Sequence, residues 1–281
     1  MSSRIEDYAL IGDCTTAALI GRDGSVDWLC WPRFDSDACF AALLGDAGHG
    51  RWRIAPRDPA ARVSRRYRRD TLILETRFEC GEGAVTLIDF MPLRGVNSNL
   101  IRLVVGERGR VAMCTELVLR FGYGAIVPWV TRVDDATLRA VAGPDMVVLC
   151  TPVRLTGQNM KTVGEFEVAA GETVPFVLTY ALSHVLPPAP VDAVSALAAT
   201  ETFWTDWSKN CRPAGHCSEP VLRSLITLKA CTYWLADRRH CRGADHIFAG
   251  ATGRNEKLGL SILLVTRRHD DPARAHGCWL L

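Results

Sequence analysis

The residues best suited to chemistry in this sequence lie in one short segment, WLCWPRFD. Trp28 and Trp31 offer flat apolar faces that stack on sugar rings, while Arg33 and Asp35 can bond to hydroxyl groups. These four side chains are therefore our candidates for binding a carbohydrate. In the alternative interpretation, which we favour, Trp28 and Phe34 are core anchors and Trp31 packs against a further domain.

Other kinds of site find little support in the residue pattern. Eleven cysteines and seven histidines show no C-x-x-C or comparable ligand spacing, so we expect no metal and no cofactor. We also identify no catalytic residue. The net charge is +2 with scattered Lys and Arg, which gives no reason to expect a nucleic-acid partner, and the basic run SRRYRRD is typical of a solvated strand edge.

The sequence also bears on where the protein acts. No apolar stretch approaches the roughly 20 residues that cross a bilayer, so no membrane partner is expected. No signal peptide opens the sequence, and most cysteines lie in or beside apolar runs, where a free thiol behaves as a small core side chain. These features favour a cytoplasmic protein.

Short apolar runs separated by turn residues dominate the chain as far as residue 182. Asp23 and Gly24 stand between two such runs and predict a hairpin. About fifteen runs of this kind exceed the number in a simple sandwich, so we predict a mainly β fold, a large antiparallel β-sandwich built from two sheets. Residues 99–107 and 111–121 are predicted as two separate strands.

Two further regions favour helices. Residues 34–46 could form a short helix capped by Ser36 or Asp37. After a proline-rich hinge at residues 186–192, an Ala-rich pattern predicts a longer helix with Glu201 in contact with solvent, and another apolar period begins near residue 218. We therefore expect linker helices to follow the sandwich.

The segment from Trp234 onward has no helical or strand period and carries four of the seven histidines. Reading its codons one base out of frame, with free choice of synonymous bases, permits a peptide containing GGTRNWDYRYCWLRDA. That peptide has turn residues followed by an aromatic run and an apolar stretch, in the order of a folded domain. We interpret residues 236–281 as a frameshifted, disordered tail.

Several segments resemble glycoside hydrolase family 15, the glucoamylase, glucodextranase and trehalase group. The shifted-frame peptide resembles the start of its catalytic domain, and the in-frame segments IEDYALIGDCTTAALIGRDGSVDWLCWPRFDSDACF, FGYGAIVPWV and AAGETVPFVLTYALSH resemble its N-terminal domain. The resemblance implies a trehalase-like β-sandwich domain over residues 1–188 and linker helices over 189–235. It also implies that the catalytic (α/α)6 barrel, with the two glutamates that an inverting enzyme holds about 6.5–9.5 Å apart, is absent from this chain.

The implied function is that of a truncated inverting α-glucosidase, a trehalase or glucoamylase, whose substrate is trehalose or a glucan. The chain alone is expected to be inactive. The alternative is a stand-alone carbohydrate- or partner-binding β-sandwich, which would require an exposed aromatic platform. An apolar surface meant to face the barrel, including residues 221–228, is expected to promote self-association.

Overall fold

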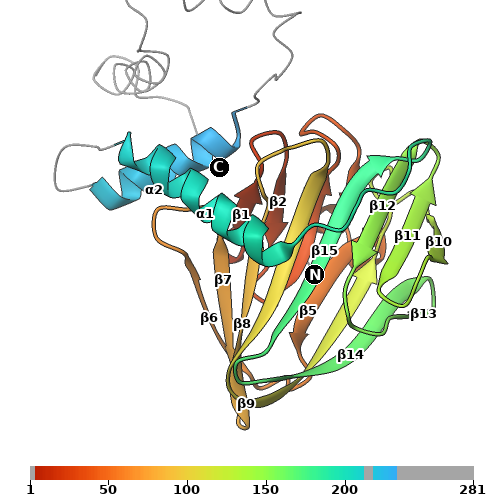
Figure 1. Ribbon diagram of the computed structural model, residues 1–281, viewed down its shortest axis with the longest axis horizontal. Helices are drawn as coiled ribbons and strands as arrows, with labels where there is room; N and C mark the ends of the chain where they lie inside the picture. Colours follow the sequence, from red (N-terminus) through yellow and green to blue (C-terminus); the bar gives the residue numbers. More distant parts are fainter. Residues whose placement is uncertain (1–3, 212–217, 233–281) are drawn as a thin grey trace, which may run out of the picture. The chain divides into compact units, whose positions relative to one another are not determined.

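The computed structural model describes residues 4–211 and 218–232, which belong to one compact unit. This part of the chain is mainly β, as predicted, with fifteen antiparallel strands arranged in two packed layers and two α-helices (Figure 1). Neither of the two described helices has the length and hydropathy that a membrane span requires. The predicted frameshifted tail lies outside the described residues.

The two layers share one strand, β9, which covers Ser98–Val118. The fifteen strands therefore form one continuous sheet and not the two sheets that the sequence predicts. In the first layer β9 is joined by β1 (Ala9–Gly12), β2 (Ala17–Ile20), β3 (Ser25–Cys30), β4 (Ala38–Phe40), β5 (Arg51–Pro56), β13 (Thr156–Gln158) and β14 (Lys161–Ala169). In the second layer it is joined by β6 (Arg62–Tyr67), β7 (Leu74–Glu79), β8 (Gly83–Phe90), β10 (Trp129–Arg132), β11 (Thr137–Ala142), β12 (Asp145–Cys150) and β15 (Thr173–Leu182).

The 21-residue strand β9 replaces the two strands that the sequence predicts. Its first part pairs with β8 and β15, and its second part pairs with β5 and β14. The change falls at Gly109, whose φ of 63° suits glycine and where a Cβ would lie 2.0 Å from the Glu82 carbonyl oxygen. Residues 107–110 resemble a turn because they are polar and exposed, although the chain continues through them as a strand.

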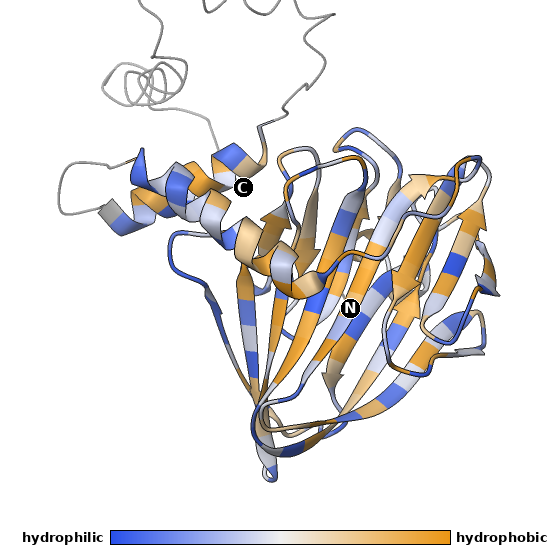
Figure 2. Ribbon diagram, in the orientation of Figure 1, coloured by the Kyte–Doolittle hydropathy of each residue, from blue (hydrophilic) through white to orange (hydrophobic). Residues whose placement is uncertain are grey.

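The core fills the space between the layers. The strands alternate apolar and polar residues along their length (Figure 2). From the two layers, Trp52 and Phe176 meet edge to face with ring centroids 6.2 Å apart, a favoured aromatic geometry. Large apolar side chains from both layers therefore hold the sandwich together.

A fully buried arginine, ion-paired within the second layer, also reaches across to the first layer. Arg102 on β9 donates to Asp89 Oδ1 at 2.7 Å, and neither side chain is exposed to solvent. The same guanidinium donates to the carbonyl oxygens of Trp52 at 2.9 Å and Gly24 at 2.7 Å, and lies 5.0 Å from the centroid of the Trp52 ring. These bonds offset the cost of removing two charges from water.

The helix α1 (Ala193–Lys209) packs beside the second layer, and α2 (Ser218–Ala230) packs against α1 and beside β1 of the first layer (Figure 1). Trp204 of α1 is buried against Leu72 and Ile226. Glu201 does not simply face solvent as expected, because Arg68 donates to its Oε2 at 2.6 Å. An ion pair and an apolar cluster thus fix the helices to the sandwich.

The expected helix over residues 34–46 is wrong. Ala38–Phe40 forms β4, which is buried and pairs with β3, and only Ala42–Leu44 takes up a short 3-10 turn. Pairing of a buried apolar segment with β3 outweighs the local capping signals.

Candidate functional site

The predicted binding segment follows β3 as an anchored loop. Arg94 donates to the Pro32 carbonyl oxygen at 2.5 Å and to Asp13 Oδ2 at 3.0 Å. Asp13 is buried and also accepts from Ser98 at 2.8 Å, and the Phe34 amide donates to the Thr15 carbonyl oxygen at 3.1 Å. These contacts hold the loop against the end of the sandwich.

The two candidate tryptophans point to opposite faces of the first layer. Trp31 is 3% exposed and lies in the core, 6.0 Å from the ring of Tyr180. Trp28 is half-buried outside the main core, where its ring lies 6.2 Å from that of Tyr123. Trp31 therefore packs inside the sandwich and not against a further domain, and the two rings do not form one stacking platform.

Arg33 and Asp35 lie together on the exposed surface of the loop. Arg33 donates through Nε to Asp35 Oδ1 at 2.8 Å and through Nη2 to Oδ2 at 2.5 Å. This hydrogen bonding holds the pKa of the Asp35 carboxyl below its usual value. The carboxyl is thus an anion that can accept hydrogen bonds at neutral pH.

The structure adds two exposed aromatic residues that sequence reasoning did not select. Tyr123 is 45% exposed beside Trp28, and Trp129 on β10 is 77% exposed. β10 is the last strand in the order of the second layer, and Val127 and Val130 near it are also exposed. Their segment, FGYGAIVPWV, contributed to the family resemblance. Its aromatic residues were the feature of the sequence that could have indicated an exposed binding surface.

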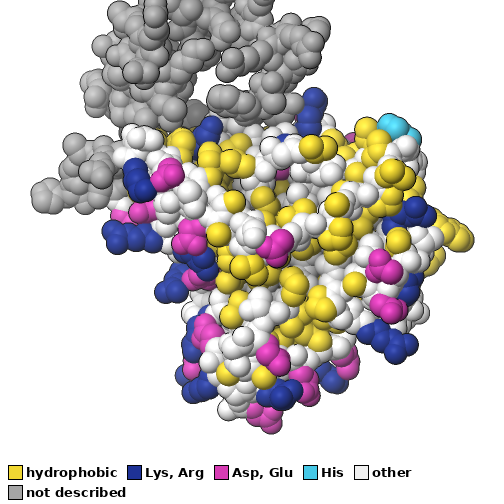
Figure 3. Space-filling model, in the orientation of Figure 1, with side chains coloured by type: hydrophobic (Ala, Val, Ile, Leu, Met, Phe, Trp, Pro, Cys, Tyr) yellow, Lys and Arg dark blue, Asp and Glu magenta, His cyan; other side chains and the backbone are white. Residues whose placement is uncertain are grey.

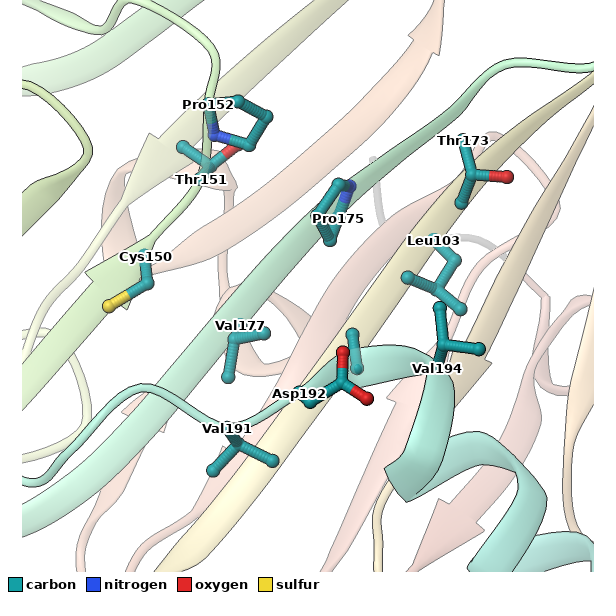
Figure 4. Close-up of a pocket in the computed structure, with 11 residues that line it drawn as sticks. Leu103, Cys150, Thr151, Pro152, Thr173, Pro175, Val177, Val191, Asp192 and Val194 are labelled. Carbon is teal, nitrogen blue, oxygen red and sulfur yellow. The ribbon is translucent and has the colours of Figure 1, made fainter.

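An apolar hollow of about 320 Å³ opens where α1 begins (Figure 4). Leu103, Val177, Val191 and Val194 line it, and the carboxylate of Asp192 stands among them. Figure 3 shows hydrophobic side chains gathered across the same face, below α1. The size is near the lower limit of small-ligand pockets, and the lining suits an apolar group.

The Asp192 carboxylate in this hollow has a structural partner. It caps α1 by accepting from the Ser195 amide at 2.9 Å. Hydrogen bonding with the Ser195 side chain, and then with this amide, lowers the pKa of Asp192. The hollow therefore offers contacts for docking and shows no acid–base arrangement.

The described residues bear on the requirements of a metal site and of a catalytic barrel. Within residues 4–211 and 218–232 there is no group of three His, Cys, Asp or Glu side chains that could hold a metal ion. The same residues form two α-helices, whereas an (α/α)6 barrel is built from twelve.

Comparison with known proteins identifies the sandwich. A family described as "Trehalase-like, N-terminal" matches residues 1–184. The chain belongs to this family. Trehalases from Mycolicibacterium smegmatis and Thermoplasma volcanium are 28% and 23% identical to it over 256 and 236 residues, each covering 82% of the chain. Trehalase 1 of Sulfolobus acidocaldarius is 34% identical over 131 residues, or 47% of the chain.

The likeness extends to a solved structure. A bacterial glucoamylase complexed with acarbose superposes with a TM-score of 0.56 at 10% identity, over 82% of this chain and 41% of the glucoamylase. That similarity shows a shared fold. The trehalase-like chain spans 38% of the length of the M. smegmatis and T. volcanium trehalases and 22% of that of the S. acidocaldarius enzyme.

Proposed function

We propose that this chain is the N-terminal part of an inverting α-glucosidase of glycoside hydrolase family 15 and has no hydrolase activity by itself. The observation that carries the proposal is the match of residues 1–184 to a trehalase-like N-terminal domain, in a chain that spans only 38% of its trehalase relatives. The substrate class would be an α-glucoside, either trehalose or a glucan.

In this proposal the sandwich and the helices have different roles. Residues 1–188 form the sandwich domain and residues 189–235 the connection to a catalytic domain, whose two glutamates lie outside this chain. Of the four candidate residues, the half-buried Trp28 and the exposed Arg33 and Asp35 are open to a sugar or a neighbouring domain. A cytoplasmic location is part of the proposal, supported by the eight free cysteines of the described residues.

Exposed apolar side chains support the proposed self-association of the chain when it is made alone. Val221 and Leu228 of α2 are 41% and 52% exposed. Apolar patches of this kind are usually covered by a partner. In the complete enzyme the catalytic domain would be the partner, and a second copy would take its place in the isolated chain.

The test begins with the gene. Sequencing across the codons for Lys229 to Arg242 and past the last codon should reveal a continuing frame that encodes a barrel with two glutamates. The 281-residue chain and that longer product are then assayed for glucose release from trehalose and maltotriose. Release by the longer product alone supports the proposal. Release by the 281-residue chain, or a longer product without glycosidase activity, would contradict it.

A further inference from the structure

A polar groove of about 620 Å³ crosses the outer surface of the first layer. It runs over β5, β9 and β14 and is bordered by the segment that leads into β13. Its main polar side chains are those of Arg51, Arg53, Glu116, Arg154, Gln158 and Glu165. Trp52 and Ile54 point into the core, so the alternation along β5 turns Arg51 and Arg53 outward.

Strand pairing brings these side chains together from distant parts of the sequence. Arg53 on β5 lies opposite Glu116 on β9, and Glu116 lies opposite Val163 on β14. The groove floor therefore presents a guanidinium, a carboxylate and an apolar side chain in one row. Its volume falls within the range of small-ligand sites.

Several hydrogen-bonding groups of the groove are unused. The Arg51 guanidinium lies 3.8 Å from Asp23 and 3.7 Å from Glu116, distances longer than a hydrogen bond. Its Nε is buried and has no hydrogen-bond partner in the described part of the chain. Arg154 is exposed and forms no ion pair or hydrogen bond with the residues that the structure describes.

Other charges on the same layer are paired at close range, and these include the groove's own carboxylates: Lys161 donates to Glu116 at 3.1 Å. Arg57 donates to Glu165 at 3.1 Å, and Arg110 donates to Glu167 at 3.3 Å. The lack of partners at hydrogen-bond distance is therefore particular to Arg51 and Arg154 and is not general to this surface. The buried Nε of Arg51 is out of reach of a ligand, whereas the terminal nitrogens of Arg51 and the exposed Arg154 guanidinium can donate to a ligand with hydroxyl groups.

The presence of both positive and negative side chains in the groove favours a ligand that can donate and accept hydrogen bonds. Three guanidinium groups lie among two carboxylates, and each carboxylate also accepts from a cation at 3.1 Å, Glu116 from Lys161 and Glu165 from Arg57. Sugar hydroxyls donate and accept equally well and can use both kinds of group. Val163 and Cys114 offer apolar contacts to the C–H face of a sugar ring.

We propose that the polar groove binds a short α-glucoside of two or three rings, separately from any catalytic centre. The choice of an α-glucoside rests on the proposed function, whereas the groove itself rests on the unused groups of Arg51 and Arg154. Binding is expected to be weak, because hydrogen bonds to the sugar replace hydrogen bonds to water.

The test uses the complete 281-residue chain and saturation-transfer NMR with maltotriose and trehalose, with inorganic phosphate as a competitor. Arg51→Gln and Arg154→Gln remove the open donors. Arg110→Gln is the matched control, since it removes a guanidinium from the same layer outside the groove. We expect each groove variant to raise the sugar Kd about tenfold, the effect of one charge-assisted hydrogen bond, and the control to leave it unchanged.

Three results would overturn the groove assignment. One is the absence of sugar binding by folded wild-type chain. Another is equal binding by the wild type and both groove variants, which would place any sugar elsewhere. The last is displacement of sugar by millimolar phosphate, which would identify an anion site. The proposed function is tested separately, because glucose release by the longer product does not depend on this groove.

Discussion

Loss of the ion pair between Arg102 and Asp89 should strongly destabilise this chain. Arg102→Met keeps most of the side-chain volume but removes the donors to Asp89, Trp52 and Gly24. It leaves a carboxylate with 0% exposure and no counter-ion. Breaking such a buried pair typically costs about 3–5 kcal/mol, a large share of the roughly 5–15 kcal/mol that stabilises a domain.

Urea unfolding of the 281-residue chain, followed by tryptophan fluorescence, measures this loss. Arg110→Met is the matched control, because Arg110 and Glu167 form an exposed pair with 64% and 60% side-chain exposure, expected to contribute less than about 1 kcal/mol. The double variant Arg102→Met/Asp89→Leu removes both buried charges. It should be at least about 2 kcal/mol more stable than the sum of the two single effects predicts.

Two results would refute this reasoning. An Arg102→Met chain that loses less than about 1 kcal/mol would mean that water or a rearranged neighbour compensates the carboxylate. A double variant whose loss equals the sum of the single losses would mean that the two charges act independently.

Three further predictions concern other parts of the molecule. Trp204→Ala, at a side chain only 1% exposed, should cost about 3–5 kcal/mol in urea unfolding, whereas Leu228→Ala at a half-exposed position should change little. Hydrogen bonding from Thr86 and then from a neighbouring arginine lowers the pKa of Glu107. The stability that the ionised Glu107 contributes is therefore present at neutral pH and disappears as the pH falls through the lowered pKa. The difference in unfolding free energy between wild type and Glu107→Gln should shrink in acid, and a constant difference from pH 7 to pH 2 would count against this assignment. Leu228→Lys should reduce self-association in light scattering, and unchanged oligomers would exclude this face of α2 as the contact.

The sequence predicts the mainly β fold because strand alternation is a local property. It does not predict that β9 runs through residues 107–110, because those residues are polar where the strand leaves one layer for the other. Nor does it predict β4, whose burial depends on pairing with β3. Local signals locate the strands, while pairing between distant segments sets their limits.

The candidate site also combines features that local sequence predicts with features that depend on long-range folding. Trp28 and Trp31 are three residues apart, and odd spacing along an extended chain already places side chains on opposite faces; the sequence thus contained the reason that they do not share a platform. Arg51 and Arg154, by contrast, are separated by about a hundred residues. Only the folding of the first layer brings them to one groove.

The shared strand β9 has a consequence for how the protein unfolds. Its first part supplies the partner of β8 and β15, and its second part supplies the partner of β5 and β14. Loss of β9 therefore removes one hydrogen-bonded neighbour from central strands of both layers at the same moment. The layers cannot melt one after the other, and the sandwich should gain and lose its structure in a single cooperative transition.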